Sequence, residues 1–282
     1  MVRIVTDTTS GISLAEASAL GVDMVPQIII FGSKSYRDDT ELDTRTFLEK
    51  LRTSPTLPKT AAPPPALYEP IFGPWVEAGE SIVCLHPSAE VSGTVRSATV
   101  AKEGFPGADI RVVDTRTVAA PLAAMVKLAA RWARDGADAD TIVAGVHDLM
   151  ARQEIYFVVD TLEYLQKGGR IGGAKALVGG LLHVKPILTV RNGRVEPLEQ
   201  QRTARRAVSR LIELVLTQCP RSEDAYVSVM HADAEEQAAA LAQEFREQLG
   251  VSETPIYQLP PAIVVHGGPG ALAASFFRAQ TP

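Results

Sequence analysis

Alternating strand-like and helix-like segments in the first half of the chain constrain its fold more than any other feature. The run VRIVTD at 2–7 is typical of a buried strand, and the polar residues after it lead into SLAEASALG, which begins with a helix-capping serine. Further strands are expected at residues 24–32, 81–88 and 109–115, and further helices at residues 92–105 and 117–136. Strands that alternate with helices predict a mostly parallel sheet.

The pattern changes after residue 152. Two short strand-like runs flank Asn192-Gly193, the preferred centre of a two-residue hairpin turn. A helix is expected at 203–218, followed by a strand at 225–231, a helix at 233–250 and a closing strand at 261–270. The 282 residues suit two domains. We therefore expect an N-terminal α/β domain with a mostly parallel sheet at 1–152, and a C-terminal α+β domain with a mixed sheet at 153–282.

Charge and composition disfavour several classes of protein. The net charge is −5 and the cations form no basic stripe, which disfavours nucleic-acid binding. We expect no membrane span and a cytoplasmic location, because the sequence holds no run of about 18 apolar residues and no signal-peptide core. Cys84 and Cys219 are the only cysteines, and the histidines lie far apart, so neither a disulfide nor a metal site is indicated.

Four polar residues at predicted strand ends or glycine turns suit an anion site. They are Thr60, Ser92, Arg170 within GGRIGG, and His266 before GGPG. Ligands of open α/β sheets bind beyond the carboxyl ends of strands, and helix N-termini attract anions. Each residue also has an ordinary alternative: Ser92 as a helix cap, Thr60 and His266 as loop residues, and Arg170 as a solvated side chain in a tight turn.

Motifs of common enzymes and nucleotide sites are missing. The sequence has no GxGxxG fingerprint in a strand-to-helix turn, no Walker GxxxxGK[ST] and no GxSxG elbow. Asp7 and Asp114 follow strands, where N-capping explains both more simply than catalysis. We therefore expect no cofactor and little catalysis by this chain alone.

Apolar runs near those polar residues suggest an amphipathic ligand. Most of these side chains belong to the core, but one anion-binding group beside a long apolar cavity fits a fatty acid. The candidates for lining such a cavity are Ile28, Ile30, Leu165 and Leu181.

Taken in order, the motifs resemble the DegV family of bacterial fatty-acid-binding proteins. The shared segments are TDTTSGIS at 6–13, SYRDD at 35–39, PKT at 58–60, VSGTVRSA at 91–98, VVDT at 112–115, the long block at 161–188, NGRVEPLEQQRT at 192–203 and HGGPGALA at 266–273. The resemblance spans nearly the whole chain, and the block TLEYLQKGGRIGGAKALVGGLLHVKPIL is its most specific part.

The resemblance implies two α/β lobes that enclose one long-chain fatty acid. It also implies a binding subunit of bacterial fatty acid kinase, which presents the acid to a separate ATP-using subunit that makes acyl phosphate for phospholipid synthesis. By the same resemblance, Thr60 and Ser92 match hydroxyls that hold the carboxylate, with Gly93 beside them. Arg170 and His266 match the polar residues that complete its surroundings.

Residues 60–64 depart from the family pattern. The family commonly has Thr-Ser-Gln-Pro-Ser there, and this chain has Thr-Ala-Ala-Pro-Pro. Thr60 is kept, but Ala61, Ala62 and Pro64 replace polar side chains. We expect a less polar lining near the carboxylate.

Three arginines at the start of a predicted helix suggest a partner surface. Arg202, Arg205 and Arg206 run against the helix dipole, which favours negative charge near an N-terminus. They suit an acidic surface of the kinase subunit, and a solvated helix face is the ordinary alternative.

Two other functions stay open: an acyl-transfer or hydrolytic enzyme that uses Ser92 with His266, and a lipid-sensing regulator.

Overall fold

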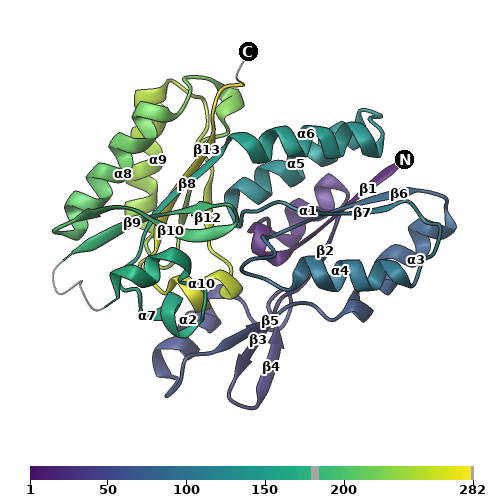
Figure 1. Ribbon diagram of the computed structural model, residues 1–282, viewed down its shortest axis with the longest axis horizontal. Helices are drawn as coiled ribbons and strands as arrows, with labels where there is room; N and C mark the ends of the chain where they lie inside the picture. The colour runs from purple at the N-terminus through teal and green to yellow at the C-terminus, as the bar shows by residue number, and fades with distance from the viewer. Residues whose placement is uncertain (179–183, 281–282) are drawn as a thin grey trace. The chain divides into compact units, whose positions relative to one another are not determined.

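The computed structural model describes residues 1–178 and 184–280 and divides into two compact units (Figure 1). Unit 1 is Met1–Ala151 and unit 2 is Arg152–Pro282. The division lies next to the domain boundary expected from the sequence, and each unit is described by itself.

A parallel sheet forms the centre of unit 1, as predicted. Its strands, in spatial order, are β2 (Val22–Val25), β1 (Val2–Asp7), β6 (Ser81–His86) and β7 (Ile110–Asp114). All three pairings are parallel, and they align Val5 with Cys84 and His86 with Asp114. The carboxyl ends of β1 and β6 therefore carry Asp7 and His86 on neighbouring strands.

Helices cover the sheet because its strands are apolar on both faces. Val5, Ile82 and Cys84 pack with α3 (Glu69–Glu77) and α4 (Thr94–Glu103), while α5 (Ala120–Arg134) packs on β1 and β6. The remaining helices of the unit are α1 (Leu14–Leu20), α2 (Thr44–Thr53), α6 (Ala139–Arg152), η1 (Thr8–Ser10) and η2 (Pro65–Leu67). Cys84 is a buried, free thiol.

A small antiparallel sheet in unit 1 was not predicted. It has the order β4 (Lys34–Arg37), β3 (Ile28–Phe31), β5 (Lys59–Ala61). The prediction of one strand over 24–32 is wrong, because β2 ends at Val25 and β3 begins at Ile28 in a different sheet. Pro26 separates them, and a proline cannot donate a hydrogen bond to a strand ladder.

Unit 2 contains the predicted mixed sheet. Its six strands, in spatial order, are β10 (Arg194–Gln201), β9 (Lys185–Arg191), β8 (Gln153–Val158), β13 (Leu272–Phe277), β11 (Ser228–His231) and β12 (Ile256–Gln258). Only β11 and β12 pair in parallel among these strands. The predicted hairpin is confirmed, because β9 and β10 are joined through Asn192 at φ 52° and Gly193 at φ 79°.

Two long helices cover one face of this sheet. The helices α8 (Ala204–Gln218) and α9 (Glu235–Leu249) lie side by side (Figure 1) and bury Tyr156, Ile187 and Phe276 against the strands. The shorter elements of the unit are α7 (Glu163–Lys167), η3 (Gly172–Leu177), η4 (Glu223–Ala225) and α10 (Pro261–Gly267).

The prediction of a closing strand over 261–270 is wrong. Residues 261–267 form α10, and the closing strand β13 begins only at Leu272. The β-branched run Ile263-Val264-Val265 favours a strand, but Pro261 at the first helical position is preorganised to begin a helix. His266 therefore lies in the last turn of a helix rather than at a strand end.

Candidate functional site

Unit 1 holds a buried pair of side chains at the carboxyl ends of its central strands. Asp7 ends β1 and His86 ends β6, and both are 0% exposed. The Nδ1 atom of His86 lies 2.9 Å from Oδ2 of Asp7, and its Nε2 atom lies 3.2 Å from the hydroxyl of Tyr68. Both ring nitrogens of His86 therefore have hydrogen-bond partners inside the protein. Asp7 has a partner in His86 in addition to the capping role expected from the sequence.

Asp7 also connects to Ser92 through a chain of hydrogen bonds. Its Oδ1 atom accepts from Nε2 of Gln27 at 3.0 Å, and the same Nε2 donates to Oγ1 of Thr94 at 2.8 Å. Thr94 Oγ1 lies 2.8 Å from the Ser92 hydroxyl oxygen. Gln27 and Thr94 are buried and Ser92 is half-buried, so the chain leads from the interior toward Ser92.

Ser92 is not the N-cap residue of α4, although its Oγ atom accepts from the backbone N–H of Thr94 at 3.3 Å. The N-cap residue is Gly93, and it has no side chain to accept from the helix. A Cβ on Gly93 would lie 3.3 Å from Cβ of Ala62, so the strand segment after Thr60 passes close to the start of α4. The structure thus brings Ser92 and Gly93 beside the segment that follows Thr60.

The register of the small sheet separates Thr60 from two apolar candidates. Thr60 is opposite Ile29, whereas Ile28 is opposite Ala61 and Ile30 is opposite Lys59. Directly opposed residues share a face, and successive residues alternate between faces. Thr60 therefore lies on the face of the buried Ile29, and the half-buried Ile28 and Ile30 lie on the other.

Asp38, in the SYRDD motif, belongs to the same buried region. Its Oδ1 atom accepts from the Thr8 hydroxyl at 2.8 Å and from the backbone N–H of Gln27 at 2.8 Å, and its buried Oδ2 atom has no hydrogen-bond partner. Burial, as the main cause, raises the pKa of Asp38 to about 7. A carboxyl group that takes up a proton near neutral pH therefore lies beside the chain through Gln27.

Unit 2 brings together the other two predicted residues, Arg170 and His266. Arg170 donates from Nη1 to the backbone oxygen of Gly168 at 2.8 Å, and a Cβ on Gly168 would lie only 2.2 Å from Nδ1 of His266. Burial, and then the nearby Arg170 charge, lower the pKa of His266 to about 4. The imidazole is therefore neutral at pH 7, next to a cationic guanidinium.

Close packing explains most of the glycines around Arg170. A Cβ on Gly172 would lie 2.1 Å from the backbone oxygen of Val195, and one on Gly173 would lie 1.9 Å from Oε2 of Glu196. Gly268 approaches the Tyr164 ring in the same manner, at 2.6 Å. These glycines hold α7, η3 and α10 tightly within unit 2 and fix the position of Arg170 and His266.

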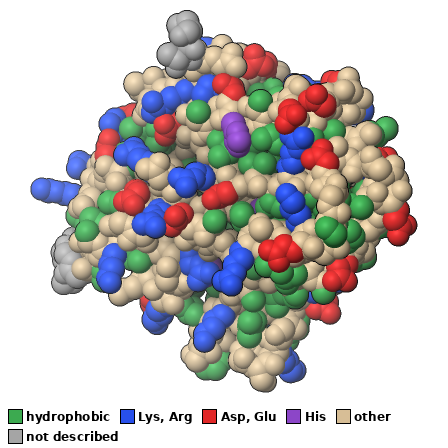
Figure 2. Space-filling view, turned by 45° about the vertical axis from the view of Figure 1, so that its right-hand side comes forward, with side chains coloured by type: hydrophobic (Ala, Val, Ile, Leu, Met, Phe, Trp, Pro, Cys, Tyr) green, Lys and Arg blue, Asp and Glu red, His purple; other side chains and the backbone are tan. Residues whose placement is uncertain are grey.

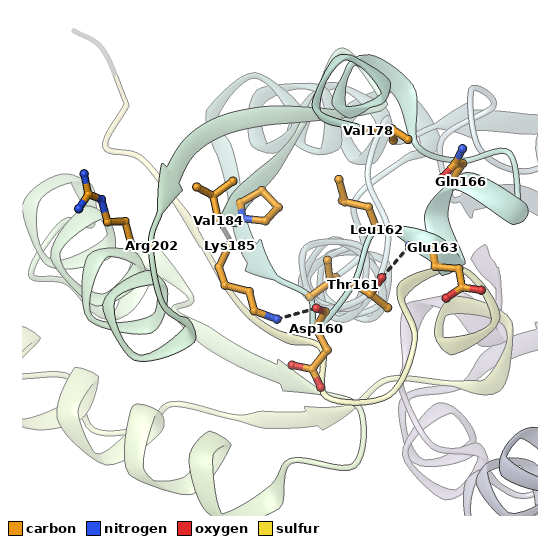
Figure 3. Close-up of a pocket in the computed structure, with 11 residues that line it drawn as sticks. Asp160, Thr161, Leu162, Glu163, Gln166, Val178, Val184, Lys185 and Arg202 are labelled. Carbon is orange, nitrogen blue, oxygen red and sulfur yellow. Dashed lines mark hydrogen bonds between the residues drawn. The ribbon is translucent and has the colours of Figure 1, made fainter. Parts of the chain in front are cut away.

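A pocket of about 420 Å³ lies elsewhere in unit 2 (Figure 3). Lys185 and Asp160 lie on its wall, where Nζ of Lys185 donates to the Asp160 backbone oxygen at 2.7 Å. Arg202 also lines it, but the predicted carboxylate residues do not. Leu165 is buried in α7, and the candidate Leu181 lies outside the described residues.

The three arginines lie where the sequence placed them. Thr203 caps α8, so Arg202 precedes the helix and Arg205 and Arg206 lie in its first turn, and all three are exposed. Figure 2 shows Lys and Arg side chains interspersed with Asp and Glu side chains over the face in view.

The local bonding of Ser92 does not resemble that of an activated nucleophile. Its hydroxyl bonds to Thr94, whereas the imidazole of His86, which is also in unit 1, bonds to Asp7 and Tyr68. Residues 1–178 and 184–280 hold no group of three His, Cys, Asp or Glu residues that could bind a metal ion. No helix in these ranges combines the length and apolar character that crossing a membrane requires.

Comparison with known proteins identifies the class of this α/β chain. The family model described as uncharacterised protein, DegV family, matches residues 1–279. A DegV domain-containing protein of Streptomyces coelicolor is 36% identical over 96% of each chain. The chain therefore belongs to the DegV family.

Solved structures of the family share the fold over its full length. The structure described as showing fatty acid binding of a DegV family protein from Thermus thermophilus has a TM-score of 0.90 and 30% identity, over 99% of both chains. DegV of Bacillus subtilis, described as a fatty acid binding protein, has a TM-score of 0.87 and 29% identity, also over 99% of both chains.

Sequence reasoning missed the residues behind Ser92. Gln27, His86 and Tyr68 lie in no motif that marks a site, and the sequence favours only a capping role for Asp7. Asp7, Asp38 and Thr94 do lie within quoted segments, TDTTSGIS, SYRDD and VSGTVRSA, but nothing in the sequence singles them out there. What the sequence lacks is the sheet order that brings the ends of β1 and β6 together.

Proposed function

We propose that this protein binds one long-chain fatty acid, with its carboxylate held by polar groups and its acyl chain in an apolar cavity. The observation that carries the proposal is the Ser92 hydroxyl, which is held by an internal hydrogen-bond chain at the start of α4. The full-length similarity to two DegV proteins described as fatty acid binding supports it.

Several polar groups bind the carboxylate in this proposal. Ser92 and the backbone of Gly93 supply hydrogen-bond donors, and Arg170 supplies a cation. Hydrogen bonds to a charged acceptor are about twice as strong as neutral ones. His266, neutral at pH 7, donates or accepts without adding a second charge. Thr60 supplies a second hydroxyl, although its side chain shares a face of the small sheet with the buried Ile29.

Apolar side chains surround the acyl chain in this proposal. Ile28 and Ile30 share one face of β3 and are only half-buried, which leaves apolar surface for a ligand. Leu165 contributes from α7. Burial of each methylene group of an acyl chain contributes about 0.8 kcal/mol, so a long chain supplies most of the affinity. In this proposal Ala62, which lies close to Gly93, replaces a polar side chain near the carboxylate.

We further propose that the protein presents the bound acid to a separate ATP-using kinase subunit in the cytoplasm, which forms acyl phosphate for phospholipid synthesis. This chain performs no catalysis by itself in that scheme. Arg202, Arg205 and Arg206 supply the docking surface, because they are exposed, cationic and not required by the dipole of α8. Charge complementarity of this kind governs partner choice and association rate more than ligand affinity.

The experiment compares binding of oleic acid by the delipidated parent protein, Ser92→Ala and a matched control. Ser92→Ala should weaken binding about ten-fold or more, because losing a donor to a charged group costs about 1.5–3 kcal/mol. Ser18→Ala, an exposed serine on α1, should bind as the parent does. Equal binding by all three would contradict the carboxylate site, and turnover of acyl esters by the parent alone would favour a stand-alone enzyme instead.

A further inference from the structure

The hydrogen-bond chain from Asp7 to Ser92 has a direction that follows from the donor and acceptor capacity of its groups. A carboxylate only accepts, and the carboxyl oxygens of Asp7 face donors from Thr9, Gln27 and His86. The side-chain nitrogen of Gln27 only donates, and it has two hydrogens. One hydrogen goes to Asp7 and the other goes to Oγ1 of Thr94.

The direction continues through Thr94. Its hydroxyl oxygen accepts from Gln27, and its own hydrogen is available to donate to the Ser92 oxygen 2.8 Å away, which is the direction assigned in the proposal below. The backbone N–H of Thr94 also points to that oxygen, at 3.3 Å. The Ser92 oxygen then accepts two hydrogen bonds, and its own hydrogen has no acceptor within this chain. It points out of the network.

We propose that Gln27 and Thr94, anchored on Asp7, are positioning residues that turn the Ser92 O–H outward as a hydrogen-bond donor. This inference rests on the proposed function, because it assigns the outward hydrogen to the ligand headgroup. A serine hydroxyl alone rotates and serves donors and acceptors equally. Ser92, held in this direction, favours a headgroup that only accepts, such as a carboxylate, over one that also donates.

A pair of ligands with the same acyl chain separates this role from a merely structural one. A fatty acid carboxylate can only accept, so its binding depends on the direction of the Ser92 hydrogen. A fatty alcohol both donates and accepts, so it can bond to Ser92 in either direction. The ratio of the two affinities therefore reports the direction, while apolar contacts and overall stability affect both ligands alike.

The experiment measures dissociation constants of oleic acid and oleyl alcohol for the delipidated full chain and its variants. Thr94→Val keeps the side-chain shape and removes the hydroxyl, and it should weaken oleic acid about five-fold and oleyl alcohol less than two-fold. Thr94→Ser restores the hydroxyl and should restore the ratio. Thr99→Val, an exposed position on the same helix, should leave both affinities unchanged.

A second variant keeps the test decisive if Thr94→Val does not fold. Gln27→Met removes the upstream donor, which frees Thr94 to turn, and it should lower the preference for the acid about two-fold to five-fold. An unchanged acid-to-alcohol ratio, or an equal loss for both ligands, would overturn the directional role while leaving fatty acid binding intact. A parent protein that binds neither ligand would instead overturn the proposed function, and the inference with it.

Discussion

The two units position their polar residues by different physical means. In unit 1, Asp7, Gln27 and Thr94 are buried and fix one another through hydrogen bonds that lead to Ser92. In unit 2, Arg170 and His266 lie among glycines, and at Gly168, Gly172 and Gly268 a side chain would collide with neighbouring atoms. Hydrogen bonds between side chains thus position the polar residues of unit 1, and close packing at glycines positions those of unit 2.

The largest expected effect concerns the buried pair of unit 1. Asp7→Ala removes the acceptor of His86, Gln27 and Thr9 together, and each buried donor left without an acceptor costs about 1–3 kcal/mol. Arg170→Ala in unit 2 should cost less, about 1 kcal/mol, because this side chain is half-buried and its bond to the Gly168 backbone oxygen is a single hydrogen bond. Urea unfolding of both variants measures the difference, and equal losses would remove the contrast between the units.

The next effect tests steric fit in unit 2. A Cβ at position 168 meets His266 and the Tyr164 backbone oxygen at 2.2 and 2.9 Å, so Gly168→Ala should cost about 2–3 kcal/mol. The neighbouring Gly169 has φ 72° but no atom within 4 Å of a Cβ, so Gly169→Ala should cost only about 1–2 kcal/mol. Thermal and urea unfolding of the two variants rank them, and the reverse order would show that backbone strain, not packing, governs this segment.

The pH dependence of stability should have opposite signs in the two units. The folded-state pKa of Asp38, about 7, lies above its unfolded value, so folded protein binds more protons between about pH 4 and 7 and stability falls as pH rises there. The folded-state pKa of His266, about 4, lies below its unfolded value near 6.5, so stability falls as pH drops from about 6.5 to 4.

Variants separate these two contributions. Each slope approaches at most about 1.4 kcal/mol per pH unit, and Asp38→Asn and His266→Gln should each remove one of them. Urea unfolding between pH 4 and 8 measures the parent and both variants. Asp38→Asn with the same pH profile as the parent would show that Asp38 is already ionised at low pH in the folded protein.

The sequence predicted the architecture better than the local site. The parallel sheet of unit 1 and the Asn192-Gly193 hairpin followed from periodicity and turn chemistry, which are local properties. The break at Pro26 and the helix at 261–267 were missed, because the β-branched runs beside them favour strands, whereas Pro26 interrupts a strand ladder and Pro261 begins a helix. The bonds among Asp7, Gln27 and His86 join residues far apart in sequence, so no local pattern could reveal them.

The smallest effect on this chain alone is expected at the arginine surface. Arg202→Ala should change stability by less than about 0.5 kcal/mol, because the side chain is exposed. It should leave oleic acid affinity nearly unchanged and slow acyl-phosphate formation with the kinase subunit, since rim charges act on association. A coupled assay with that subunit and ATP measures the rate. Equal loss of lipid binding would place Arg202 in the ligand site, and an unchanged rate would leave the cluster as a solvated helix face.

Binding of a long-chain fatty acid by this chain underlies the proposed function. Native mass spectrometry of protein purified from a bacterial host can detect the bound acid directly. An empty apolar cavity forfeits about 0.8 kcal/mol for each methylene group that it could bury, so an acid from the host should stay bound through purification. We expect a mass increment of about one fatty acid per chain, identified by gas chromatography after denaturing extraction, and a reduced increment for Ser92→Ala. Protein that carries no stoichiometric fatty acid, and takes up none when oleic acid is added, would contradict fatty acid binding by this chain.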